Sequence, residues 1–158
     1  MLNLVSIREA TLNDIEKICS IEEKSFNKED MYSKDLFRFY LTIAPKTFLV
    51  VELYNEVVGY VIAVIRRNYI GHIVSIAIDP NFRGKKLGRM LMEEIERKLR
   101  AMGCTVLRLE VDENNIIAHN LYLSLGYRDA YKIPCYYYGG RPAIVMFKLK
   151  QENHRKSV

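Results

Sequence analysis

The chain has 158 residues, 49% of them apolar and 27% charged, with a net charge of +5. This length and composition predict a single folded domain over residues 1–150, and they exclude a membrane-spanning segment because no apolar run is long enough. Basic side chains are scattered among acidic ones except at residues 83–89, so we expect binding to neither nucleic acid nor membrane.

The first part of the chain predicts a strand followed by two helices. The strand surrounds Ile7, and Thr11 with Asp14 forms a start for the first helix that resembles a capping box. Ser33 is expected to cap the second, shorter helix. Apolar residues at helical spacing predict the buried faces of the two helices, namely Leu12, Ile15, Ile18, Cys19, Leu36, Phe37, Tyr40 and Leu41.

Three β-rich segments follow the helices. Residues 47–53 and 57–65 are β-branched and apolar, and the turn residues 54–56 between them predict a hairpin. Asp79-Pro80-Asn81 ends the third strand, since proline cannot donate to a β-ladder. Alternation within this strand predicts one face with His72, Val74, Ile76 and Ile78, and an opposite face with Ile73, Ser75 and Ala77.

A basic turn, residues 83–88, joins this strand to a helix. Apolar residues recur at helical spacing from Leu87 to Leu99, and Gly103 should end the helix as its C′ residue. The first N–H groups of a helix lack intrahelical partners, so with the helix dipole and nearby cations they can hold a phosphate or pyrophosphate. Taken alone, the turn is equally consistent with a solvated loop.

The last part predicts a strand at 105–111, a helix at 116–125 stopped by Gly126, and a final strand at 143–149. Before that strand, Tyr136, Tyr137 and Tyr138 with Gly139-Gly140 predict an aromatic hairpin. The polar residues 151–158 predict a disordered tail. The order of elements, β-α-α-β-β-β-α-β-α-β-β, predicts an α/β fold with a mixed sheet.

Cysteine usage and the amino terminus bear on the location of the protein. Cys19, Cys104 and Cys135 are odd in number, widely spaced and set among apolar neighbours, which predicts reduced core residues rather than disulfides. The first residues alternate apolar and polar types, a pattern unlike that of a signal peptide. We therefore expect a cytoplasmic protein. Separately from this argument, we expect a monomer or a homodimer.

Two segments together resemble the GNAT acetyltransferase superfamily. Arg83 and Gly88 match the phosphate-loop pattern R/Q-x-x-G-x-G/A, with Lys86 where the family usually has its first glycine. If Lys86 needs a left-handed backbone, the cost is about 1 kcal/mol, which we expect the fold to tolerate. The second family motif keeps every spacing in Leu109-Glu110-Val111, Asn115, Ala118, Leu121-Tyr122 and Gly126-Tyr127.

The resemblance covers roughly residues 6–149 and implies both fold and cofactor. It implies a mixed, mostly antiparallel central sheet, flanked by helices on both faces, in which two parallel strands splay apart. The pantetheine arm of acetyl-CoA would lie in that gap, with coenzyme A as the product. The residues implied in cofactor binding are Ile76, Ala77, Ile78, Arg83, Gly84, Lys85, Lys86, Leu87, Gly88, Arg89, Asn115 and Tyr122.

Three residues are implied in the chemistry of acetyl transfer, which needs a proton removed from an ammonium and a departing thiolate stabilised. Glu110 matches the base of RimI-like enzymes, acting through a water, and Tyr122 matches the tyrosine beside the cofactor sulfur. Outside the motif, Glu110 would be an exposed strand carboxylate and Tyr122 a packing residue. His72 resembles a histidine of archaeal N-terminal acetyltransferases that orders a water or binds a metal with this glutamate. Two ligands make a poor zinc site, so we predict no metal.

Residues expected to bind the acceptor also resemble those of known N-terminal acetyltransferases. Tyr136 and Tyr137 resemble the peptide-clamping pair of N-terminal acetyltransferases, although Arg141-Pro142 stands where archaeal members have acidic residues. Phe26, Glu29 and Tyr32 belong to the segment that corresponds to the loop facing the first substrate side chain, and Glu29 is a candidate second base. An α-amine with a pKa near 8 is easier to deprotonate than lysine near 10.4, by about 3 kcal/mol.

We therefore predict transfer of an acetyl group from acetyl-CoA to the N-terminal α-amine of proteins by direct attack in a ternary complex. The expected partners are protein or peptide N-termini, including those of ribosomal or nascent chains. The alternatives are a lysine or polyamine-like small-molecule acetyltransferase, and a non-catalytic acyl-CoA-binding or nucleic-acid-binding module.

Overall fold

The computed structural model describes residues 4–151, so most of the predicted tail lies outside the described residues. The order of helices and strands is the predicted one. The strands are β1 (Val5–Glu9), β2 (Phe48–Leu53), β3 (Glu56–Arg66), β4 (Ile70–Ile78), β5 (Val106–Asp112), β6 (Arg128–Ile133) and β7 (Ala143–Leu149). The helices are α1 (Ile15–Ser25), α2 (Lys34–Ile43), α3 (Leu87–Ala101) and α4 (Ile116–Ser124).

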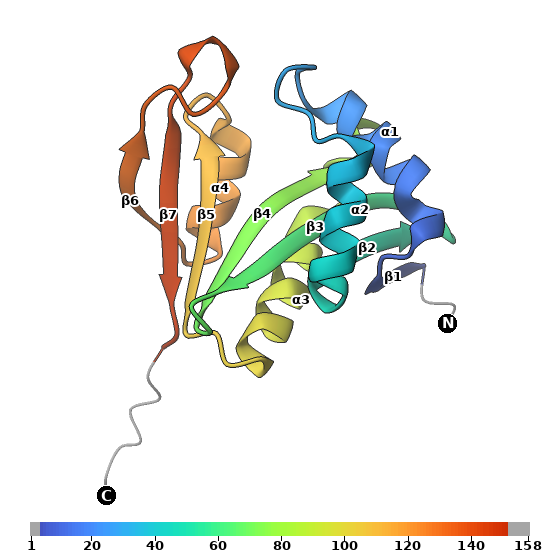
Figure 1. Ribbon diagram of the computed structural model, residues 1–158, viewed down its shortest axis with the longest axis horizontal. Helices are drawn as coiled ribbons and strands as arrows, with labels where there is room; N and C mark the ends of the chain where they lie inside the picture. The colour runs from blue at the N-terminus through green and yellow to red at the C-terminus, as the bar shows by residue number, and fades with distance from the viewer. Residues whose placement is uncertain (1–3, 152–158) are drawn as a thin grey trace, which may run out of the picture.

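The strands form one seven-stranded sheet in the order β1-β2-β3-β4-β5-β7-β6. Neighbouring strands pair antiparallel except β4 and β5, which are parallel. Helices α1 and α2 cover one face of the sheet, and α3 and α4 cover the other (Figure 1). Each face buries its own apolar cluster, so the predicted mixed sheet with helices on both faces is confirmed.

The pairing of β4 with β5 is short. It joins Ile70–Ile73 to Val106–Leu109 and then stops, although both strands continue. Beyond this point the two strands diverge and leave a gap in the middle of the sheet (Figure 1). The carboxyl-terminal part of β4 therefore has no β5 partner for the backbone groups on that edge.

A β-bulge interrupts β4. Ile62 of β3 pairs with Ser75 and Ala63 pairs with Ile73, so Val74 is an extra residue without a β3 partner. Ile73 consequently packs in the same cluster as Ile76 and Ile78, while Val74 packs in the opposite one with Ala77. The strict alternation predicted for this strand is wrong, because an extra residue shifts the facing of the side chains that precede it.

Local signals for the ends of elements agree with the structure. The Thr11 N–H donates to Asp14 Oδ2 over 2.8 Å, and the Ser33 hydroxyl accepts from the Leu36 N–H. Gly103 and Gly126 follow α3 and α4 with φ of 95° and 100°, a conformation that glycine adopts without strain. Strand β6 was predicted without bounds, because nearly all its side chains are exposed and give no apolar alternation.

The cysteines are free, as predicted, but only partly in the core. Cys104 is buried and Cys19 half-buried, whereas Cys135 is exposed in the loop before β7. The expectation of a core position for Cys135 is therefore wrong, because its apolar neighbours in sequence lie in a surface loop. Within residues 4–151, the helices are too short or too polar to cross a membrane.

Candidate active site

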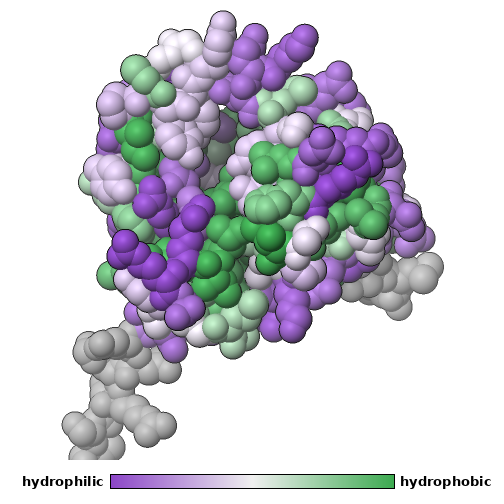
Figure 2. All heavy atoms as spheres, in the orientation of Figure 1, coloured by the Kyte–Doolittle hydropathy of each residue, from purple (hydrophilic) through white to green (hydrophobic). Residues whose placement is uncertain are grey.

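A pocket of about 530 Å³ opens where β4 and β5 separate. It lies between the segment that joins α1 to α2 and the segment that joins β6 to β7, and its mouth is a hollow near the upper edge of the molecule (Figure 2). Nine predicted site residues line it: Phe26, Glu29, Tyr32, Ile76, Glu110, Asn115, Tyr122, Tyr136 and Tyr137. The structure thus gathers candidate catalytic, cofactor and acceptor residues from five separate segments.

Glu110 is fixed by two neighbours. Its Oε1 accepts from Arg108 Nε over 2.8 Å, and its Oε2 lies 2.6 Å from His72 Nε2. Burial alone raises the pKa of this carboxyl, but the hydrogen bonds from His72 and Arg108 outweigh it and lower the pKa below its ordinary value. Glu110 is therefore a firmly held carboxylate, better suited to orienting a water or an ammonium than to keeping a proton.

His72 acts on Glu110 from outside the pocket lining. Its Nδ1 accepts from Arg66 Nε over 2.8 Å, so the ring proton lies on Nε2 and points at Glu110. The predicted proximity of this histidine to Glu110 is present in the structure. Among the described residues, no cluster of three or more His, Cys, Asp and Glu side chains could hold a metal ion.

Tyr122 lies on α4 with 7% of its surface exposed, at the wall of the pocket. Its ring meets that of Tyr127 edge to face at 6.1 Å, which fixes its orientation. Burial raises the pKa of Tyr122 to about 12. The hydroxyl therefore stays protonated and can donate a hydrogen bond toward a developing negative charge.

The predicted phosphate loop directly precedes α3, and its residues 83–86 are exposed. Lys86 has φ 62° and ψ 19°, so the position where the family pattern usually has a glycine is left-handed in this chain. A Cβ on Gly88 would lie 3.7 Å from Leu121 and 3.8 Å from Ile78, so the start of α3 adjoins both α4 and the end of β4. Lys85 and Lys86 are exposed, which leaves both ammonium groups available to an anion.

Several predicted cofactor residues are held by the protein itself. Arg83 Nε donates to the Ile78 carbonyl over 3.1 Å, and Arg89 hydrogen-bonds the Ser124 hydroxyl. The side chains of Leu87 and Ala77 are buried, so only their backbone groups remain for a ligand. Asn115 lines the pocket and uses its Oδ1 to cap α4 at the Ala118 N–H.

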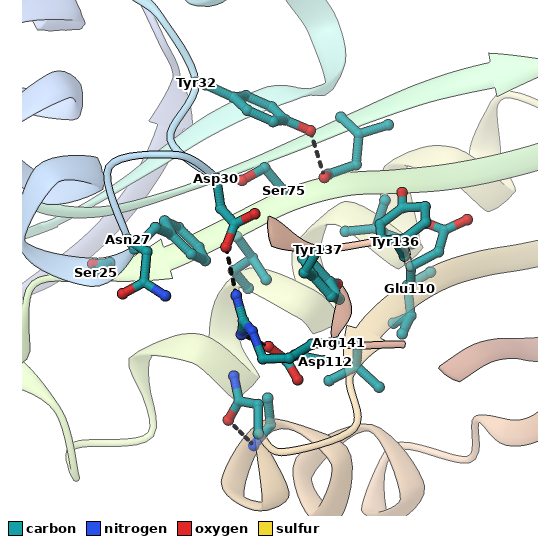
Figure 3. A pocket seen from close by; sticks show the side chains of 18 of the residues that line it. Ser25, Asn27, Asp30, Tyr32, Ser75, Glu110, Asp112, Tyr136, Tyr137 and Arg141 are labelled. Atoms are coloured by element: carbon teal, nitrogen blue, oxygen red, sulfur yellow. Dashed lines mark hydrogen bonds and ion pairs between the residues drawn. The ribbon is translucent and has the colours of Figure 1, made fainter. Parts of the chain in front are cut away.

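An ionic clip joins the two segments over the pocket. Arg141 Nη2 contacts Asp30 Oδ2 at 2.6 Å, and Arg141 Nη1 contacts Asp112 (Figure 3). The Tyr138 N–H donates to Asp30, and the guanidinium lies 5.5 Å from the Tyr137 ring centroid. The clip thus orders the tyrosine-bearing segment against the α1–α2 segment.

Sequence reasoning missed several functional candidates, among them Glu22, Ser75, Arg108, Asp112 and Arg141. Asp30 and Arg141 are 111 residues apart, and no local pattern indicates such a pair. Glu22 did leave a signal, because it stands four residues after Ile18 on the apolar face of α1. A charged residue at a core position of a helix is expected to have partners or a function.

The site fits acetyl-CoA. The unpaired edge of β4 offers backbone groups to an amide-bearing arm, and the start of α3 offers free N–H groups beside Lys85 and Lys86 to a pyrophosphate. The two features meet at Ile78 and Gly88, at the end of the gap between β4 and β5.

Comparisons with known proteins agree with this geometry. The model of the acetyltransferase (GNAT) family matches residues 12–127. An uncharacterised N-acetyltransferase of Methanocaldococcus jannaschii is 32% identical over 145 residues, which is 91% of each chain. The structure of Ard1 from Thermoplasma volcanium has a TM-score of 0.88 at 26% identity, covering 94% of this chain and 99% of the other. The ribosomal-protein-S18-alanine N-acetyltransferase of Escherichia coli has a TM-score of 0.81 at 23% identity, covering 96% and 97%.

Proposed function

The chain belongs to the acetyltransferase (GNAT) family and is an acetyl-CoA-dependent acetyltransferase, and we propose that its acceptor is the α-amine at the N-terminus of a protein. The observation that carries the proposal is the pocket between the α1–α2 and β6–β7 segments, which leads from an aromatic mouth to Glu110. The similar fold of the E. coli enzyme, which acts on an alanine of ribosomal protein S18, supports a protein substrate.

Charge within the pocket favours a cationic acceptor. Five carboxylates line it, from Glu22, Glu29, Asp30, Glu110 and Asp112. Among the described lining residues, Arg141 is the one cation. A chain with a net charge of +5 thus presents an acidic cavity, which attracts an ammonium group and disfavours an anionic acceptor.

The cofactor would be held on the other side of the transfer site. We propose that Arg83, Lys85 and Lys86 with the first N–H groups of α3 bind its pyrophosphate, and that β4 beyond Ile73 binds its arm. When bound, acetyl-CoA supplies an acetyl thioester. Asn115 and Tyr122 would border the reacting end, since both line the pocket.

The protein's own groups then serve the two halves of the transfer. Glu110 would orient the acceptor nitrogen or a water that takes its proton. As the carbon–nitrogen bond forms and the carbon–sulfur bond breaks, Tyr122 would donate a hydrogen bond to the sulfur, and solvent would supply the thiol proton. Direct attack is favoured because none of the described cysteines lines the pocket, and burial raises the pKa of Cys19 and Cys104.

A matched set of acceptors tests the proposal. The protein would be incubated with labelled acetyl-CoA and a library of short peptides with free N-termini, and parallel reactions would contain the same peptides with a formyl block. Free polyamines and an N-blocked lysine peptide complete the set. We expect label on free N-termini alone. Label confined to the polyamine or to the blocked lysine peptide would overturn the choice of acceptor while leaving the acetyltransferase itself intact.

A further inference from the structure

A second carboxylate, Glu22, lies beneath the pocket and is absent from the chemistry described above. It is 2% exposed on α1, yet it contributes to the pocket lining. Its Oε1 accepts from the Tyr32 N–H over 3.0 Å, and its Oε2 accepts from the Tyr60 hydroxyl. Both oxygens act as acceptors, which is the pattern of an ionised carboxylate.

A chain of two hydrogen bonds connects the pocket to Glu22, and every donor in it points toward Glu22. Tyr60 has a single hydroxyl hydrogen, and it is committed to Glu22. The Ser75 Oγ lies 2.8 Å from the Tyr60 Oη, so Ser75 must be the donor in that bond. The lone pairs of Ser75 are then left to accept a hydrogen, and this side chain lines the pocket (Figure 3).

The bulge in β4 lies directly beside this connection. Ser75 shares the facing of Ala77, two residues further along, and therefore lies on the side of the sheet where Tyr60 and α1 pack. The extra residue Val74 separates it from Ile73, which packs toward α3. The same Val74 carbonyl accepts from the Tyr32 hydroxyl over 3.0 Å, which fixes the wall beside Ser75.

The two buried carboxylates differ in their affinity for a proton. Glu110 has both oxygens occupied by cationic or ring N–H donors, and its pKa is lowered. Burial raises the pKa of Glu22, against the opposing effect of hydrogen bonds from Tyr32 and Tyr60. The ionisable groups that face Glu22 are Cys19 on its own helix, Tyr32 and Tyr60.

We propose that Ser75, Tyr60 and Glu22 form a proton relay that takes a proton from the acceptor ammonium. Ser75 accepts a proton from the ammonium while its own hydrogen passes to Tyr60, whose hydrogen passes to Glu22. The net change converts an ammonium and a carboxylate into a neutral amine and a carboxylic acid. Tyr60 is neutral before and after, consistent with the raised pKa of a tyrosine buried beside Glu22.

In this proposal Ser75 touches the acceptor and is the catalytic residue, while Tyr60 and Glu22 act through it. The relay rests on the proposed acetyl transfer to an amine but not on the amine being an N-terminus. Any amine that enters the pocket as a cation must lose a proton before it attacks.

The test measures the single-turnover rate of acetyl transfer, with enzyme in excess over the acceptor that the wild-type protein acetylates. Ser75→Ala and Tyr60→Phe should each slow this rate at least about tenfold, less than the roughly hundredfold or greater effect of losing a sole general base, because Glu110 remains. Ser75→Thr keeps the hydroxyl and should restore most of the rate. The double variant Ser75→Ala/Tyr60→Phe should be no slower than either single variant, since one broken link interrupts the whole chain.

Two further readouts separate a relay from a structural role. The rate in mixtures of light and heavy water should curve with deuterium fraction in the wild type and become straight in Ser75→Ala, because several protons move together only in the relay. Thr47→Val is the matched control: Thr47, just before β2, donates a buried hydroxyl hydrogen bond to the Ala63 carbonyl of β3 over 2.6 Å, and neither residue lines the pocket. This variant should keep the wild-type rate.

The relay is refuted if Ser75→Ala and Tyr60→Phe transfer acetyl at the wild-type rate, or if Ser75→Thr is as slow as Ser75→Ala. Should Tyr60→Phe fail to fold, the Ser75 pair and the isotope curve still decide the question. An acceptor other than a peptide N-terminus would overturn the proposed substrate alone, because the same rates can then be measured with that acceptor.

Discussion

Replacing Lys86 by glycine should make the protein more stable and weaken its binding of coenzyme A. With φ 62° and ψ 19°, Lys86 occupies the left-handed region, which costs an L-residue about 1–2 kcal/mol. Glycine removes this strain but adds about 0.5–1 kcal/mol of backbone entropy to the unfolded chain. We expect a net gain of about 0.5–1 kcal/mol in the free energy of unfolding.

Urea unfolding followed by circular dichroism measures this gain, with Lys86→Ala as the matched control. Alanine removes the ammonium but keeps the strained backbone, so glycine should exceed alanine at this position by about 0.5–1 kcal/mol. The urea midpoint should rise without a change in slope. A glycine variant no more stable than the alanine variant would refute the reasoning, because it would show that the loop carries no strain at this residue.

The same two variants test the role of the ammonium. Each removes one exposed cation from the phosphate loop, so calorimetry should find coenzyme A bound about twofold to fivefold more weakly in both. Equal losses assign the effect to charge. A loss confined to Lys86→Ala would instead assign it to the backbone.

Three other changes probe the acceptor mouth, the core and the acid-sensitive amino terminus. Arg141→Gln should raise the KM for the acceptor about threefold to tenfold, because it releases the clip to Asp30 and Asp112, while steady-state kinetics should find the KM for acetyl-CoA unchanged. Gly59→Ala should destabilise the protein by about 1–3 kcal/mol in urea, since its Cβ would meet Ile78 Cδ1 at 2.4 Å and Ala77 O at 3.0 Å, whereas Gly88→Ala, with space around it on α3, should not destabilise it. The hydrogen bond from Arg8 lowers the pKa of Asp14 below its ordinary value of 3.8. The contribution of Asp14 to the free energy of unfolding is therefore fully present above that pH, and it is lost as the pH falls through the pKa of the folded state. Asp14→Asn should therefore lower stability by about 1–2 kcal/mol at pH 7, and a gap from wild type that does not shrink below pH 4 would contradict this.

The elements and their ends were predictable from the sequence because their causes are local. Caps such as Ser33 and the stop at Gly126 depend on neighbours within a few residues. The bulge at Val74 was not predictable, since an inserted residue leaves the types of side chain unchanged and becomes visible only in the pairing with β3.

The residues of the active site likewise fall into those that the sequence predicts and those that only the folded chain brings together. The motif residues Glu110 and Tyr122 were predicted, and both line the pocket. His72 was predicted beside Glu110 through the family resemblance, and it lies there. Arg108 was not predicted, because its hydrogen bond to Glu110 depends on side-chain geometry. Arg141 belongs to the pocket through a contact that only the folded chain brings about.

The short parallel pairing between β4 and β5 has a mechanical consequence. Within the sheet, only four residue pairs of the described chain join a part made of β1 to β4 to a part made of β5, β7 and β6. A molecule held in the gap would touch both parts at once and so cross-link them far from the hinge. Binding of a molecule in the gap should therefore slow amide hydrogen exchange in the strands on both sides of the gap. Each substrate would also reduce the relative motion of the two parts, between which the other substrate must be aligned.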